Sequence, residues 1–142
     1  MPKNRMERLG IFIGTWNTTG EVYATDGAPP TTLSATDTYR WLPGRHFIAH
    51  EADARLGKDM SRSLEIIGYD AKSRKFRSHA YDDRGTREEF EVQLEGRRWR
   101  ILGESVRFTG SFNPARDQLT GLWETKAKRG WQPWIKLRLS RA

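Results

Sequence analysis

The chain has 142 residues, a formal net charge of +7 at pH 7 and no cysteine. That length is most simply one domain, residues 1–142. Without cysteine there are no disulfides, thiolate metal sites or cysteine nucleophile. The N-terminal sequence MPKNRMERLGIFIG is too short and too charged for a signal peptide, and no stretch approaches the roughly 18 apolar residues of a membrane span. We therefore expect a cytoplasmic protein that does not enter a membrane.

The positive charge is scattered along the chain. Its longest purely basic runs are pairs, such as Arg97-Arg98 and Lys128-Arg129. Several basic residues are predicted to project outward from the last strands: Arg98, Arg100, Arg107, Lys126, Lys128, Lys136 and Arg138. A net positive charge favours the binding of polyanions in general. The outward side of these last strands, however, lacks a platform of several aromatic rings. A solvated surface explains it better than binding of nucleic acid or protein.

In chain order, the sequence predicts a short helical turn over Pro2–Leu9 and then only strands. The strands are short, and each ends at a turn signal such as PG, DDRG, EG or KRG, as in all-β barrels and sandwiches. The expected strands cover residues 12–23, 34–42, 46–56, 62–69, 74–82, 87–94, 97–103, 105–112, 118–127 and 131–140.

Period-two alternation is strong in "EEFEVQLEGRRWRIL". A two-residue turn at Glu95-Gly96 pairs Val92 with Trp99, which brings the apolar sides of the two strands together. About ten strands are apolar on one side only, and the sequence predicts no helices to cover that side. The fold must therefore bury the apolar face in another way. Closing the meander into an antiparallel up-and-down β-barrel does so and removes the sheet edges. Ten strands also leave more interior room than eight.

The last hairpin predicts a three-residue loop at residues 128–130, because only that loop pairs the inward Trp123 with Ile135. In this register Trp134 lies on the outer face beside Glu124. With Leu102 and Leu122 it would form an apolar patch, and we expect any homodimer contact there.

Short motifs along most of the chain resemble a known family. Gly14-Thr15-Trp16 looks like the G-x-W signature of lipocalin-like, or calycin, barrels. With Trp41–Phe47, Gly68–Asp70 and Phe76–Asp82, the pattern resembles an uncharacterised bacterial family, domain of unknown function 1579. The resemblance implies a calycin barrel, the type found in lipocalins and fatty-acid-binding proteins, and brings no established activity or catalytic residues.

The chain is also distantly similar to nitrobindin-type haem barrels, which share the first-strand glycine and tryptophan. Those proteins bind haem through a histidine late in the chain. Here no histidine follows His79, so we expect no haem and no other cofactor.

The stretch "TDTYRWLPGRHFIAHEADA", residues 36–54, predicts a hairpin with ionisable groups on its apolar side. A two-residue turn at Pro43-Gly44 pairs Asp37 with His50 and Trp41 with His46. The opposite side carries more charge, so we assign it to solvent. The same side as Asp37 then carries Tyr39, Trp41, His46, Ile48, His50, Ala52 and Ala54. An aspartate that accepts a hydrogen bond from a histidine fixes its tautomer and raises its pKa.

The leading hypothesis is a barrel that binds a small, mostly apolar molecule, with polar groups orienting one end. The residues expected to contact it are Asp37, Tyr39, Trp41, His46, His50, Phe90, Trp99, Phe108 and Trp123. The alternative is an enzyme that uses the Asp37–His50 pair for acid–base chemistry on such a molecule. A metal site is not expected, because His46 and His50 on one strand would lie roughly 13 Å apart.

Overall fold

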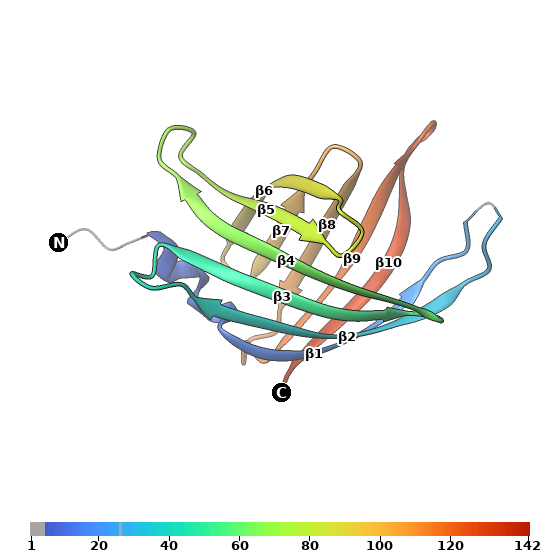
Figure 1. The fold of residues 1–142 in the computed structure, drawn as a ribbon, viewed down its shortest axis with the longest axis horizontal. Helices are drawn as coiled ribbons and strands as arrows, with labels where there is room; N and C mark the ends of the chain where they lie inside the picture. The colour runs from blue at the N-terminus through green and yellow to red at the C-terminus, as the bar shows by residue number, and fades with distance from the viewer. Residues whose placement is uncertain (1–4, 26) are drawn as a thin grey trace.

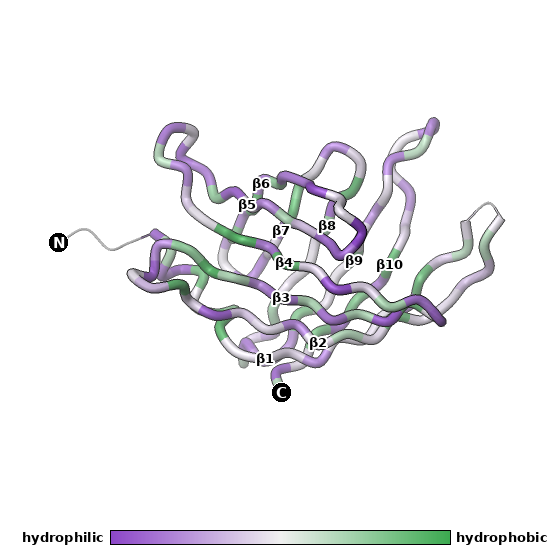
Figure 2. The backbone as a smooth tube through the Cα atoms, in the orientation of Figure 1, coloured by the Kyte–Doolittle hydropathy of each residue, from purple (hydrophilic) through white to green (hydrophobic). Residues whose placement is uncertain are grey.

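The computed structural model describes residues 5–25 and 27–142, which form a closed antiparallel β-barrel in the order β1-β10-β9-β8-β7-β6-β5-β4-β3-β2 (Figure 1). The predicted all-β, ten-strand, up-and-down barrel is therefore confirmed. Its strands are β1 (Gly14–Val22), β2 (Thr31–Trp41), β3 (Phe47–Leu56), β4 (Asp59–Asp70), β5 (Lys75–Asp82), β6 (Arg87–Glu95), β7 (Arg98–Leu102), β8 (Val106–Phe112), β9 (Gln118–Ala127) and β10 (Gly130–Arg141). Hydrophobic and hydrophilic residues alternate along these strands (Figure 2), as expected for walls with one inner and one outer face.

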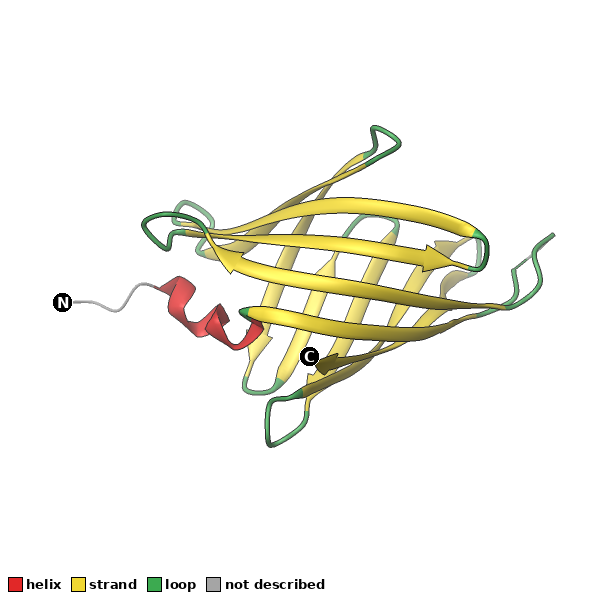
Figure 3. Cartoon of the chain, turned by 60° about the horizontal axis from the view of Figure 1, so that its bottom comes forward, coloured by secondary structure: helices red, strands yellow, loops and turns green. Residues whose placement is uncertain are grey.

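A 3-10 helix, η1 (Arg5–Phe12), lies at one end of the barrel (Figure 3). Met6, Leu9 and Phe12 recur every third residue, and side chains at that spacing share one face of a 3-10 helix. All three are at most 1% exposed, so η1 closes this end with apolar side chains. The helical turn was predicted over Pro2–Leu9; its first residues lie outside the described ones, and the helix continues to Phe12. No helix in the described part of the chain is long and apolar enough to span a membrane.

The β6–β7 hairpin differs from its predicted register by two residues. Leu94 pairs with Trp99 and Val92 with Ile101, so Gly96 and Arg97 form the turn. Gly96 has a φ of +60°, which suits the turn. The two-residue shift leaves the apolar faces together because side chains alternate with period two.

The β9–β10 hairpin contains a register irregularity that the sequence reading missed. Gly130 pairs with Ala127, so the loop is the two residues Lys128 and Arg129 and the predicted three-residue loop is wrong. The register then shifts between Pro133 and Ile135. Beyond the shift Ile135 pairs with Trp123, as predicted. The extra residue is Trp134, whose ring packs against the inward-facing Trp123 at 6.4 Å between centroids.

The predicted outer-face position of Trp134 is therefore wrong. The residue that occupies the outer face is Trp131, where the Arg107 guanidinium lies 4.3 Å from its ring centroid. A bulge adds one residue to a strand and reverses which side chains face inward before it. Dimerisation through this wall stays a prediction.

The two halves of the interior are filled differently. Around η1 the inward side chains are large and buried, among them Trp16, Ile48 and Phe112. Toward the opposite end, inward positions of β2, β3, β4 and β5 carry small residues that are only half-buried: Ala35, Ala52, Ala54, Ser61, Ser63 and Ala80. We call these the closed end and the open half.

Candidate functional site

Where the closed end meets the open half, four polar side chains form one hydrogen-bonded cluster on the inner face. His50 Nε2 lies 2.6 Å from Asp37 Oδ1, and His50 Nδ1 lies 2.8 Å from Glu65 Oε1. The Thr18 hydroxyl donates a hydrogen bond to Asp37 Oδ2, with the two oxygens 2.5 Å apart. The Tyr39 ring stacks on the imidazole, with centroids 4.0 Å apart and planes within 7°. Strands β1, β2, β3 and β4 thus each contribute to one site, the His50 cluster.

Burial disfavours a charge on His50, but its hydrogen bonds to Asp37 and Glu65 and their negative charges outweigh that cost. Together they raise the pKa of His50 from 6.5 to about 9. Burial, with the negative charges of Asp37 and Glu65, also raises the pKa of the Tyr39 phenol well above its ordinary value. At neutral pH the cluster therefore holds an imidazolium, and the Tyr39 side chain stacked on it is a neutral phenol.

The cluster is partly accessible to solvent. The side chains of Asp37, His50 and Glu65 keep 11%, 16% and 14% of their surface exposed although they point inward. Their cross-strand neighbours toward the open half are Ala52, which pairs with Asp37, and Ala80, which pairs with Glu65. Beside these small neighbours the carboxylates stay partly exposed.

The structure joins Asp37 to His50 as predicted, by a different register. Tyr39 pairs directly with His50, and Asp37 reaches the ring diagonally. The turn spans residues 43–46, closed by hydrogen bonds between Leu42 and Phe47 and between Arg45 and Leu42. Placing His46 on the inner face was wrong, because the longer turn leaves it exposed at the barrel end.

The other predicted contact residues lie in or beside the apolar core. Trp99 is 3% exposed and packs 4.5 Å from Phe12 of η1, and Trp41 stands near Gly10 of the same helix. Phe108 is also buried, against Trp123. Trp123 is half-buried and faces the open half. Contact of these residues with a ligand stays a prediction.

Sequence reasoning missed Glu65 and Thr18. Both carried a signal: Glu65 alternates in phase with the apolar Ile67 and Tyr69, and Thr18 with Trp16. Polar residues in phase with an apolar face are candidates for an inward position. Their meeting with His50 depends on strand pairings that lie outside the 36–54 hairpin.

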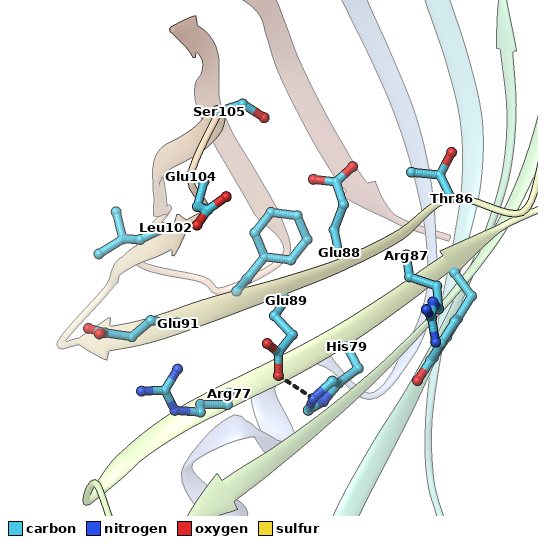
Figure 4. Close-up of a pocket in the computed structure, with 13 residues that line it drawn as sticks. Arg77, His79, Thr86, Arg87, Glu88, Glu89, Glu91, Leu102, Glu104 and Ser105 are labelled. Atoms are coloured by element: carbon cyan, nitrogen blue, oxygen red, sulfur yellow. Dashed lines mark ion pairs between the residues drawn. The ribbon is translucent and has the colours of Figure 1, made fainter.

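A cleft of about 950 Å³ lies where β7 stops short of β6. Glu88 and Glu89 point to opposite sides of β6, and Glu89 forms an ion pair with His79 at 2.7 Å (Figure 4). Phe90 lines this cleft and also packs in the core, 6.4 Å from the Trp123 ring. An added Cβ on Gly103 would come within 2.7 Å of the Phe90 ring. Phe90 thus stands in the wall between the cleft and the interior.

The His50 cluster is not arranged as a metal site. Each carboxylate contacts a different imidazole nitrogen, so the three groups do not converge on a common point. Within residues 5–25 and 27–142, no group of three or more His, Cys, Asp or Glu side chains could hold a metal ion.

The closed ten-strand antiparallel barrel with a helical segment at one end is a calycin-like fold. Residues 1–90 match the model of a family described as a protein of unknown function (DUF1579), and the chain belongs to this family. No curated protein sequence matches the chain.

Two solved structures are similar to the chain. The crystal structure of Rv2717c from M. tuberculosis superposes with a TM-score of 0.68 at 11% identity, over 96% of each chain. The zebrafish ileal bile acid-binding protein complexed with cholic acid gives a TM-score of 0.44 at 12% identity, over 93% of this chain and 99% of the other. At these identities the likeness to Rv2717c concerns the fold alone.

Proposed function

We propose that the protein binds a small, mostly apolar molecule inside the barrel, with its polar end at the His50 cluster. The main observation in support is a partly exposed, hydrogen-bonded polar cluster on the inner face. It lies between a filled apolar core and small, half-buried side chains. Ligand pockets combine such apolar walls with a few convergent polar groups. Asp37 and Glu65, both held by His50, are the orienting groups.

The geometry favours binding over acid–base catalysis by His50. A general base needs a free nitrogen lone pair within reach of the proton it removes. Both ring nitrogens of His50 already face carboxylate oxygens, at 2.6 and 2.8 Å. The imidazole therefore organises Asp37 and Glu65, which remain the groups available to a ligand.

The test uses Nile red, a neutral apolar fluorophore, titrated into the purified protein. We expect saturable fluorescence enhancement at one equivalent. Ala52→Leu enlarges an inward, half-buried side chain beside Asp37 and should weaken binding at least tenfold. The matched control is Thr36→Leu, which adds a similar group at an exposed position of the neighbouring strand.

Circular dichroism establishes that both variants are folded. Absence of saturable binding to the wild type would contradict the proposal. So would equal affinities of the two leucine variants, because the probe would then lie outside the barrel.

A further inference from the structure

Charge is divided between the two faces of the barrel wall. The chain carries a formal net charge of +7, yet within the described residues no inward position of the open half is Lys or Arg. The inward charged positions there are Asp37, His50, Asp59, Glu65, Asp82 and Glu88. Arg141 is in phase with the inner face but lies at the closed end, where it donates hydrogen bonds to the carbonyls of Ile11 and Ile13. The accessible interior is therefore acidic.

The contacts of His50 leave one negative charge in its cluster uncompensated. If the imidazole is doubly protonated, it donates to both Asp37 and Glu65, so two carboxylates share one cation. If it is singly protonated, one carboxyl group must supply the other proton. Either arrangement of the two hydrogen bonds leaves a net charge of −1, from two carboxylates and one shared positive charge. Partly buried charges are costly unless they are paired.

Glu65 is the carboxylate that can still accept a hydrogen bond from a molecule inside the barrel. Asp37 uses both oxygens, one with His50 and one with Thr18. Glu65 accepts one hydrogen bond, from His50 through Oε1, and no other described residue donates to it. Its side chain remains 14% exposed, and its cross-strand neighbour on β5 is Ala80. A donor from inside the barrel can therefore approach Oε2.

We infer that the ligand carries a protonated amine, which donates to Glu65 and neutralises the residual charge of the His50 cluster, while its apolar part contacts the inner wall. The inference rests on the proposed function and specifies the polar end of the ligand. Charge-assisted hydrogen bonds are about twice as strong as neutral ones. An anionic head would instead meet carboxylates with no inward Lys or Arg to pair with it.

The test compares dodecylamine, 1-dodecanol and dodecanoic acid as competitors of Nile red at pH 7, each below the concentration at which it aggregates or separates from solution. The three share one chain and carry a positive, a neutral and a negative head. We expect dodecylamine to bind about tenfold more tightly than dodecanol, and dodecanoate to bind most weakly. Glu65→Gln should remove the amine preference and leave the affinity for dodecanol nearly unchanged.

The matched control is Glu51→Gln, which removes one carboxylate charge from the outer face of the adjacent strand, where its side chain is 57% exposed. It should preserve the amine preference. Dodecanoate binding as tightly as dodecylamine, or an amine preference that survives Glu65→Gln, would overturn the inference. The wild-type order of the three competitors decides the matter even if Glu65→Gln fails to fold. If dodecanol binds without any amine preference, only this inference fails; if neither Nile red nor any competitor binds, the proposed function fails as well.

Discussion

The closed end and the open half are built from the same strands but are filled in opposite ways. At the closed end, Phe12 of η1 contacts Tyr39, Trp99 and Phe112, with ring centroids 4.5 to 5.1 Å apart. In the open half the inward residues of β2 to β5 are largely alanine and serine, and they stay half-buried. One end thus supplies most of the apolar burial that stabilises the fold, while the other supplies accessible polar groups. Stability and binding should respond to mutations in different halves.

The largest expected difference is in the cost of truncating a leucine. Leu9 of η1 is fully buried, whereas Leu33 faces the open half and is half-buried. We expect Leu9→Ala to lower the free energy of unfolding by ~2–5 kcal/mol, the usual cost of a buried leucine, and Leu33→Ala by less than half of that. Urea denaturation monitored by tryptophan fluorescence measures both. Equal losses would show that the two halves are packed alike.

The pH dependence of stability sharpens the boundary between the halves. In the folded protein the pKa of His50 is raised to about 9, with Asp37 and Tyr39 of β2 and Glu65 of β4 facing the ring. Protonated His50 stabilises the folded protein fully below its unfolded-state pKa of 6.5, and this stabilisation is lost as the pH rises through about 9. The unfolding free energy of the wild type should therefore fall between these pH values, and His50→Gln should flatten the decline. His79→Gln, on the outer face, is the control; a slope unchanged in His50→Gln would contradict this assignment.

The smallest expected effect is a gain in stability. Ser78 is fully buried at the closed end between Ile67 and Phe90, and its hydroxyl has no hydrogen-bond partner among the described residues. An unsatisfied buried hydroxyl is destabilising, so Ser78→Ala should raise the free energy of unfolding by up to about 1 kcal/mol. Ser63→Ala, in the open half, should leave it unchanged within error. A loss of stability in Ser78→Ala would indicate that the hydroxyl is satisfied after all.

The face of a side chain was predicted correctly from the sequence wherever the predicted strand pairing was shifted by an even number of residues. The turn over residues 43–46 is two residues longer than expected, yet Asp37, Tyr39 and His50 still share the inner face, because a shift of two preserves it. His46 was misplaced because it became part of that turn.

The bulge at Trp134 could not be anticipated in the same way. In the sequence WQPW the two tryptophans are three residues apart, so one of them faces inward in either register. Alternation of apolar and polar residues therefore does not reveal a register shift of one residue. The meeting of Glu65 with His50 likewise required the pairing of β3 with β4 in three dimensions. Alternation assigns a side chain to a face; it does not state which side chain on the next strand stands opposite.

The early end of β7 has a consequence for association between chains. The last pair between β6 and β7 joins Glu91 to Leu102, so Arg87 to Phe90 have no strand partner on that side within the described residues. Although the barrel is closed, a short stretch of β6 backbone is left without a strand partner here. Exposed edges invite strand addition from a second molecule, and charged side chains discourage it. Arg87, Glu88 and Glu89 follow one another along this edge and are all exposed, so their charges disfavour strand addition at this stretch of β6.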